Sequence, residues 1–277
     1  MIDLHVHSTI SHDASSSIRD YCLKAQELGL LEIGFSEHLD LCGIDPHYGL
    51  HDYQKYLAQV KEARKEFPDL AIRMGVEVTY LPSIQNKISE FLEGKQYDFV
   101  MAAVHLVEDG AISVSEEDPC REYFSRKTAD ECFQEFFDLT LASVRSGLFD
   151  ALAHLDIINR YGVNYYPDWE WRPHYGVLRK IFEGMIKRDM ALEINTSGFR
   201  QTVCRPYPER DLLRLYRELG GRMITIGSDA HSAQELGSGV SQAVALAGKL
   251  GFNRLVSFER RTVKWVDLKN QERPASG

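Results

Sequence analysis

The chain has 277 residues, a length that suits one large domain and is close to the roughly 250 residues of a strand–helix barrel. Its hydrophobic fraction of 44% and charged fraction of 26% are typical of a soluble globular protein, and no apolar run approaches the roughly 20 residues that cross a bilayer. The net charge of -9 disfavours polyanions such as nucleic acid as partners, but it is compatible with a small anionic substrate if the site supplies its own cations.

Seven short apolar runs alternate along the chain with longer amphipathic stretches. The runs cover residues 1–6, 32–35, 71–76, 99–104, 150–153, 191–194 and 223–226. The stretches predicted as helices cover residues 17–28, 52–67, 83–92, 129–146, 175–188, 209–219 and 233–250. Helix N-caps are predicted at Ser17, Asp52, Ser83 and Thr128.

This alternation predicts a parallel sheet with helices outside it. Seven units favour a barrel over a doubly wound sheet, which would usually show a glycine-rich phosphate loop after its first strand. We expect one domain over residues 1–268 and a disordered polar tail over residues 269–277.

The cysteines indicate a reducing compartment. They are Cys22, Cys42, Cys120, Cys132 and Cys204, an odd number without a C-x-x-C pair, which favours free thiols. Residues 1–7 resemble a strand rather than a signal peptide, so we expect a cytoplasmic protein without membrane contact.

Each apolar run is followed by polar side chains that can bind a metal. In chain order these are His5 and His7, Glu37 and His38, Glu77, His105, His154, Asn195, and Asp229 with His231. The strands of a parallel barrel all end at one face, which carries the active site, so these side chains should converge. His12 lies in the loop just after the first run.

The spacing and chemistry of these residues predict a centre with more than one metal. His5 and His7 point the same way along a strand, as do Asp229 and His231. Imidazole and carboxylate without cysteine suit Zn, Mn or Fe better than Ca or Mg. One tetrahedral ion needs about four ligands. Two or three ions are therefore expected for the candidates His5, His7, His12, His38, Glu77, His105, His154, Asp229 and His231.

The same residues fall in a pattern that resembles the PHP (polymerase and histidinol phosphatase) superfamily. The pattern is D-x-H-x-H-S-x-x-S-H-D at 3–13, S-E-H at 36–38, G-V-E at 75–77, V-H at 104–105, A-H-L-D at 153–156 and S-D-A-H at 228–231. Within it the chain resembles the monofunctional histidinol-phosphatase branch through F-S-E-H-L-D at 35–40, N-R-Y-G at 159–162, E-I-N-T-S-G-F-R at 193–200 and P-Y-P at 206–208. Arg205 departs from this pattern, since an acidic residue is expected there.

The resemblance implies a distorted (β/α)7 TIM-like barrel with three divalent metal ions at the carboxyl ends of the strands. It assigns His5, His7, Glu77 and Asp229 to the first ion. Glu77 would bridge to a second ion, completed by His105 and His154. His12, His38 and His231 would hold the third.

The activity that the resemblance implies is hydrolysis of L-histidinol phosphate to L-histidinol and phosphate, in histidine biosynthesis. A metal-bridging hydroxide would attack phosphorus. Asp229 is the candidate to pass a proton to the leaving group. Arg160 and Arg200 follow the fifth and sixth strands and suit a phosphate dianion. Glu37 could bind the substrate ammonium or orient a ligating histidine.

Three other functions fit these residues less well. A PHP phosphoesterase acting on nucleotides or oligonucleotide ends would usually lack the N-R-Y-G and N-T-S-G-F-R segments. A degenerate scaffold should have lost ligands. A metal-dependent amide or lactone hydrolase would place a lysine at the metal bridge, and none follows these runs. The sequence is compatible with a monomer and with a homo-oligomer.

Overall fold

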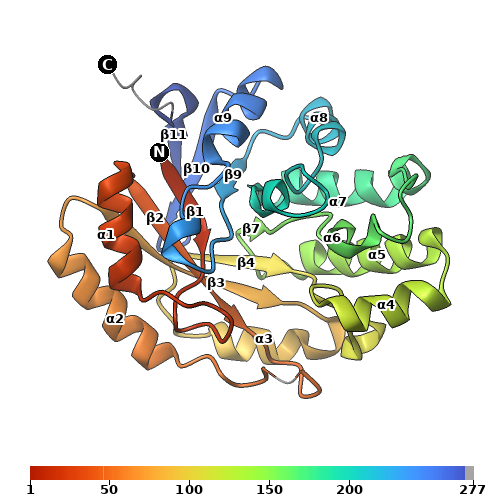
Figure 1. Ribbon diagram of the computed structural model, residues 1–277, viewed down its shortest axis with the longest axis horizontal. Helices are drawn as coiled ribbons and strands as arrows, with labels where there is room; N and C mark the ends of the chain where they lie inside the picture. The colour runs from red at the N-terminus through yellow and green to blue at the C-terminus, as the bar shows by residue number, and fades with distance from the viewer. Residues whose placement is uncertain (46, 272–277) are drawn as a thin grey trace.

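The computed structural model describes residues 1–45 and 47–271 and is built around one sheet of seven parallel strands (Figure 1). In sheet order the strands are β1 (Ile2–Val6), β2 (Glu32–Leu39), β3 (Ala71–Thr79), β4 (Phe99–Ala103), β7 (Ala151–Leu152), β8 (Ala191–Asn195) and β9 (Ile224–Gly227). Each strand therefore pairs with its predecessor in the sheet, as the alternating sequence predicts.

The two edge strands meet, so the sheet is a nearly closed barrel. The Asp229 amide donates to the His5 carbonyl at 2.7 Å, and the His7 amide donates to the Ala230 carbonyl at 2.9 Å. The buried Asp3 carboxylate reinforces this seam, because it accepts from the amides of Ser228 at 2.8 Å and Gly237 at 2.9 Å. The prediction of a distorted (β/α)7 barrel is confirmed.

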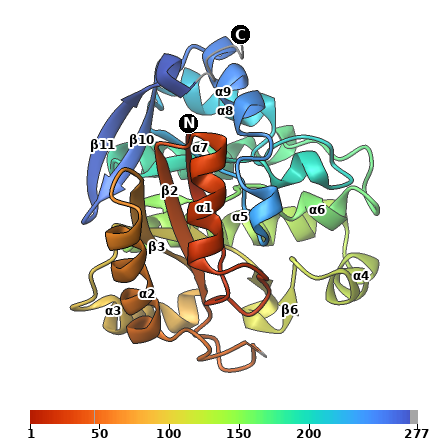
Figure 2. The same ribbon diagram turned by 60° about the vertical axis from the view of Figure 1, so that its left-hand side comes forward.

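Helices cover the outside of the barrel (Figures 1 and 2). The α-helices are α1 (Ile18–Leu28), α2 (Tyr53–Glu66), α3 (Gln85–Leu92), α4 (Glu117–Arg126), α5 (Ala129–Ser146), α6 (Asn159–Gly162), α7 (Tyr175–Lys187), α8 (Arg210–Glu218) and α9 (Val240–Lys249). Short 3-10 turns are η1 (Pro82–Ile84), η2 (Glu108–Gly110), η3 (Arg172–His174), η4 (Ser197–Arg200), η5 (Ala233–Glu235) and η6 (Leu268–Gln271). In the described residues, no helix combines the length and apolar character needed to span a membrane.

Three of the four predicted N-caps are confirmed. Ser17 and Thr128 form capping boxes, and the Asp52 side chain accepts from the Lys55 amide. The prediction at Ser83 is wrong. Ser83 lies inside η1, and its hydroxyl donates instead to Asp109 at 2.7 Å.

Several elements differ from the prediction. The stretch 233–250 is broken into η5 and α9, because Gly237 and Gly239 between them have φ of +71° and +77°, which ends helical geometry. Helices α4 and α6 were not predicted. Two antiparallel hairpins, β5 (Leu106–Val107) with β6 (Ile112–Ser113) and β10 (Arg254–Glu259) with β11 (Thr262–Asp267), were also not predicted.

The β10–β11 hairpin closes the amino-terminal end of the barrel. Val256 and Phe258 of β10 pack against residues near the starts of the strands, among them Phe99, Ala151 and Ala191. The carboxyl-terminal end stays open for a site. Residues 269–271 of the predicted tail belong to η6, where Leu268 and Gln271 are buried, and residues 272–277 lie outside the described part of the chain.

Candidate metal centre

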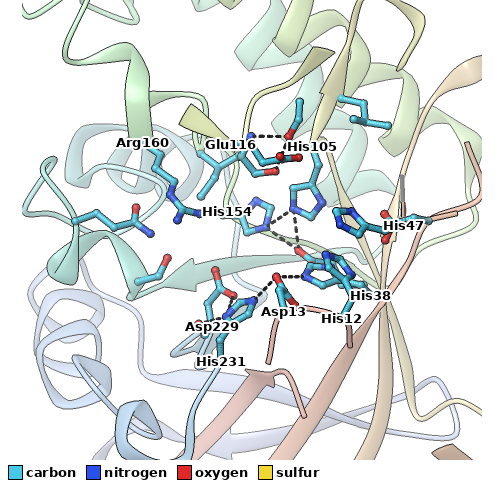
Figure 3. Close-up of a pocket in the computed structure, with 18 of the residues that line it drawn as sticks. His12, Asp13, His38, His47, His105, Glu116, His154, Arg160, Asp229 and His231 are labelled. Carbon is cyan, nitrogen blue, oxygen red and sulfur yellow. Dashed lines mark hydrogen bonds and ion pairs between the residues drawn. The ribbon is translucent and has the colours of Figure 1, made fainter. Parts of the chain in front are cut away.

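The polar side chains at the strand ends surround a cavity of about 620 Å³ at the carboxyl end of the barrel (Figure 3). Those that line it include His12, Asp13, His38, Glu77, His105, His154, Arg160, Arg200, Asp229 and His231. His5 on β1 and His7, just after its end, are fully buried and lie against this set. The convergence expected from the sequence is therefore present.

Four of these side chains meet around one point. The Nε2 atoms of His5 and His7 are 3.0 Å apart. They lie 3.5 and 3.6 Å from Glu77 Oε2, and 3.8 and 3.4 Å from Asp229 Oδ1. In a tetrahedral zinc site with bonds of about 2.05 Å, ligand atoms are about 3.3 Å apart. The spacing thus fits a single small cation.

A second group shares Glu77 with the first. Glu77 Oε1 lies 2.7 Å from His154 Nε2 and 3.5 Å from His105 Nε2, and these two nitrogens are 3.3 Å apart. The two oxygens of Glu77 therefore face different groups, the geometry that a bridging carboxylate requires.

A third group contains a residue that the sequence analysis did not single out. Asp13 Oδ2 lies 3.4 Å from His38 Nε2 and 3.1 Å from His231 Nε2. His12, the residue expected there, instead stacks on His47 with ring centroids 3.5 Å apart. The Asp13 carboxylate thus contacts both His38 and His231, while the His12 ring lies 5.5 Å from the ring of His38.

A buried carboxylate behind the cluster orients two of its members. Glu193 on β8 accepts from Nδ1 of His5 at 2.6 Å and from the His154 amide at 2.8 Å. Its Oε2 also accepts from Asn195 Nδ2 at 3.1 Å, and Asn195 donates to Asp229 at 3.3 Å. The lone charged residue within the apolar run 191–194 could have revealed this role, because it shares a strand face with Asn195.

Glu37 is fully buried and lies behind the loop that follows β1. Its carboxylate accepts from the amide and hydroxyl of Ser8 and from the amide and hydroxyl of Ser11. Ser11 Oγ in turn lies 3.4 Å from His7 Nδ1 and accepts from the His38 amide at 3.0 Å. Of the two roles weighed for Glu37, this geometry favours support of the histidines over contact with a substrate ammonium.

Two members of the cluster hold left-handed backbone conformations. The φ angle is +22° at His154 and +54° at Asp229, and neither residue is glycine. Such conformations cost about 1–3 kcal/mol each and persist where the surroundings over-determine them. Here they turn both side chains inward at the ends of β7 and β9.

The electrostatics keep the carboxylates ionised. Burial alone would raise the pKa of Glu77, but the charge of His5 and the hydrogen bonds from His154 and His38 outweigh it and hold that pKa well below its ordinary value. Asp229 has its pKa lowered in the same way, since His5, His7 and His231 outweigh burial.

Two of the imidazoles are held neutral. Burial, together with neighbouring imidazoles, lowers the pKa of His7 to about 3. Burial lowers the pKa of His105 to about 3 as well. Burial opposes the protonation of four others, but neighbouring carboxylates outweigh it and raise the pKa of His5, His38, His154 and His231. A cation that binds to these four must displace their protons, so its affinity should depend on pH.

Arg160 and Arg200 reach the same cavity from α6 and η4. Arg200 is held by the carbonyl of Ser228 at 2.9 Å and by Glu235 at 3.5 Å. Arg160 makes no ion pair within the described residues and extends into the cavity (Figure 3). Arg205 lies behind this wall, where it donates to the buried Asp156 at 2.9 Å.

Known proteins that are similar to this chain include histidinol-phosphatases. The chain is 29% identical over 259 residues to the histidinol-phosphatase of Lactococcus lactis, which covers 93% of this chain and 94% of that protein. It is 28% identical over 272 residues to a Deinococcus radiodurans protein named "probable histidinol-phosphatase", with 95% and 98% covered.

A solved structure is also similar to this chain along most of its length. The crystal structure of histidinol phosphate phosphatase from Lactococcus lactis, complexed with zinc, L-histidinol and phosphate, superimposes with a TM-score of 0.84 at 28% identity. The alignment covers 95% of this chain and 98% of that one. The model of the PHP domain family matches residues 3–197, which is more than half of the sequence. This chain therefore belongs to the PHP domain family.

Proposed function

We propose that this protein is a metal-dependent phosphomonoesterase that hydrolyses L-histidinol phosphate to L-histidinol and phosphate. The observation that carries the proposal is the joint position of a multi-histidine, three-carboxylate cluster and two arginines around one cavity. The Lactococcus lactis structure, which holds zinc together with both products of this reaction, supports it.

The ligand sets that we propose follow the three groups of side chains. His5, His7, Glu77 and Asp229 would hold one ion, and Glu77, His105 and His154 a second. His38 and His231 would hold a third together with Asp13, in place of His12. The nitrogen and oxygen donors suit Zn, Mn or Fe.

When bound, such ions would supply a hydroxide nucleophile near neutral pH and neutralise charge on the phosphoryl oxygens. The chain's own residues would do the rest. The guanidinium of Arg160 is free to fork onto two phosphate oxygens, and that of Arg200, tethered to the end of β9, would fix the third.

The carboxylates have separate tasks in this proposal. Glu77 would bridge two ions through its two oxygens. Asp229, whose side chain is 13% exposed, is the group at the cavity that could pass a proton to the leaving oxygen. Glu193 and Glu37 touch no substrate and would only hold the histidines in place.

The substrate is a small molecule, and the cavity volume of about 620 Å³ is in the range for one. All five cysteines are free thiols, which supports a reducing, cytoplasmic setting.

The decisive experiment measures phosphate release from L-histidinol phosphate and from a panel of nucleotides, after reconstitution with Mn or Zn. A strong preference for L-histidinol phosphate is expected. Equal rates on all substrates would reject this substrate and leave only a general phosphoesterase. No release from any of them would reject the phosphatase itself.

A further inference from the structure

A second hollow lies at the other end of the barrel, away from the metal-ligand cluster. It has a volume of about 280 Å³ and is lined by Arg217, Arg222, Gly251, Phe252, Asn253, Arg254 and Trp265. Arg222 precedes the start of β9, whereas Asp229 follows its end. Figure 2 draws the β10–β11 hairpin, which carries Arg254 and Trp265, far from β6 beside the large cavity. The two hollows are therefore separate sites.

Three arginines around this hollow lack acidic partners. Arg217, Arg222 and Arg254 form no ion pair with any carboxylate in residues 1–45 or 47–271. Other arginines, such as Arg64 and Arg261, are paired with carboxylates, whereas no acidic side chain is among those that line this hollow. The hollow is a local excess of positive charge on an acidic protein.

Aromatic rings hold two of these arginines in place. The Arg254 guanidinium lies 4.8 Å from the centre of the Trp265 ring, across the hairpin, and that of Arg217 lies 5.7 Å from the Phe252 ring. Arg217 Nε also donates to the Gly251 carbonyl at 3.4 Å. Stacking leaves the edges of a guanidinium, where its N–H groups are, free to bind another partner.

The side chains that line the hollow indicate what kind of ligand could bind there. Guanidinium groups bind phosphate through paired hydrogen bonds, and Trp265, 45% exposed, offers a surface for a planar ring. A volume near the lower end of small-molecule sites excludes a large ligand. We propose that this hollow binds a small phosphorylated molecule that carries a planar ring, independently of the phosphatase site.

Trp265 gives a local readout of binding. The chain has three tryptophans, and the other two, Trp169 and Trp171, lie in the segment before η3. In a Trp169→Phe/Trp171→Phe variant, fluorescence would report Trp265 alone. The metal-loaded variant is titrated with adenosine 5′-monophosphate, adenosine and inorganic phosphate, and phosphate release is followed in the same samples.

We expect a saturable change with adenosine 5′-monophosphate below about 1 mM, a much weaker one with adenosine, and weakening by salt. Arg222→Gln/Arg254→Gln should raise the apparent dissociation constant at least about tenfold, with unchanged phosphatase activity. Arg179→Gln, which removes an arginine paired with Glu183 on α7, is the matched control and should change nothing.

Two results would overturn the proposal: no saturable change with adenosine 5′-monophosphate, or a change that survives in the double arginine variant. If the tryptophan variant does not fold, calorimetric titration of the unmodified enzyme against Arg222→Gln/Arg254→Gln decides the same question, because only a site at this hollow loses binding heat.

Discussion

Glu193 Oε1 lies 2.6 Å from Nδ1 of His5, and both side chains are fully buried. This contact leaves Nε2 of His5 directed at His7, Glu77 and Asp229. Because a carboxylate on one nitrogen fixes the tautomer and raises the basicity of the other, Glu193 sets how well His5 can bind a cation.

Glu193→Gln should weaken metal binding by roughly 10- to 100-fold, the usual cost of losing such a partner. An amide has only one acceptor oxygen. In Glu193, one oxygen accepts from the His154 amide and Asn195 Nδ2, and the other accepts from His5. The single oxygen of glutamine cannot accept from all three donors. Metal content and activity are measured across a range of added zinc.

Glu32→Gln is the matched control for this variant. Glu32 is also a buried strand carboxylate, but it pairs with Arg73 at the opposite end of the barrel. It should lower stability without changing the zinc dependence. If both variants shift the zinc titration equally, Glu193 acts only through stability.

Asp13→Asn should remove the third ion and reduce activity more than His12→Gln does. Asp13 Oδ2 lies between His38 and His231, whereas His12 stacks on His47. A neutral amide is a poor metal ligand. The loss of activity in Asp13→Asn should therefore exceed the roughly 10- to 100-fold loss that is typical when a hydrogen-bond partner of a metal ligand is removed. Metal stoichiometry and kcat are measured for both variants. A larger loss with His12→Gln would restore His12 as the ligand.

The contrast between Asp13 and His12 shows where sequence reasoning stops. His5 and His7 could be placed because side chains two apart on a strand share a face, and strand ends in a parallel barrel share an edge. His12 and Asp13 are neighbours in an irregular loop, where no repeat says which one turns inward. The path of this loop is held by tertiary contacts, such as those of Ser8 and Ser11 with Glu37, which the local sequence pattern does not predict.

The hairpins show a related limit. The apolar run that contains Val256 and Phe258 is difficult to recognise in the sequence because charged residues flank it. Its side chains cover the amino-terminal end of the barrel and do not add a strand to the main sheet. The prediction of one helix over residues 233–250 is wrong for a local reason. Gly237 and Gly239 lie inside this stretch, and two glycines so close together are a sequence signal for a helix break.

Arg160→Ala should raise KM for the phosphomonoester and lower kcat/KM by about 10- to 100-fold. Hydrogen bonds to charged groups contribute about 1.5–3 kcal/mol, and 1.4 kcal/mol corresponds to a factor of ten. Arg160→Lys should recover only part of this loss, because an ammonium cannot form paired hydrogen bonds to two phosphate oxygens.

Steady-state kinetics and inhibition by inorganic phosphate test the role of Arg160. Arg172→Ala, an exposed arginine paired with Glu170, is the control. Unchanged kinetics for Arg160→Ala would remove it from the phosphate site.

Stability should fall in acid partly through His174, which lies outside the metal cluster. Burial against Phe133 and Trp169 lowers the pKa of His174, although Asp130 and Asp138 act in the opposite direction. The unfolded chain, with a histidine pKa of about 6.5, then binds more protons than the folded one below that pH. Its contribution to stability is therefore complete above about pH 6.5 and is lost as pH falls toward the folded pKa.

Melting temperatures of the metal-loaded protein and of His174→Gln, compared between neutral and mildly acidic pH, should show a steeper loss for the unmodified protein. Metal release at low pH should lower the melting temperature of both proteins alike, so a difference between their pH dependences is due to His174. If the melting temperatures of both proteins fall in parallel, the protonation of His174 is not linked to folding.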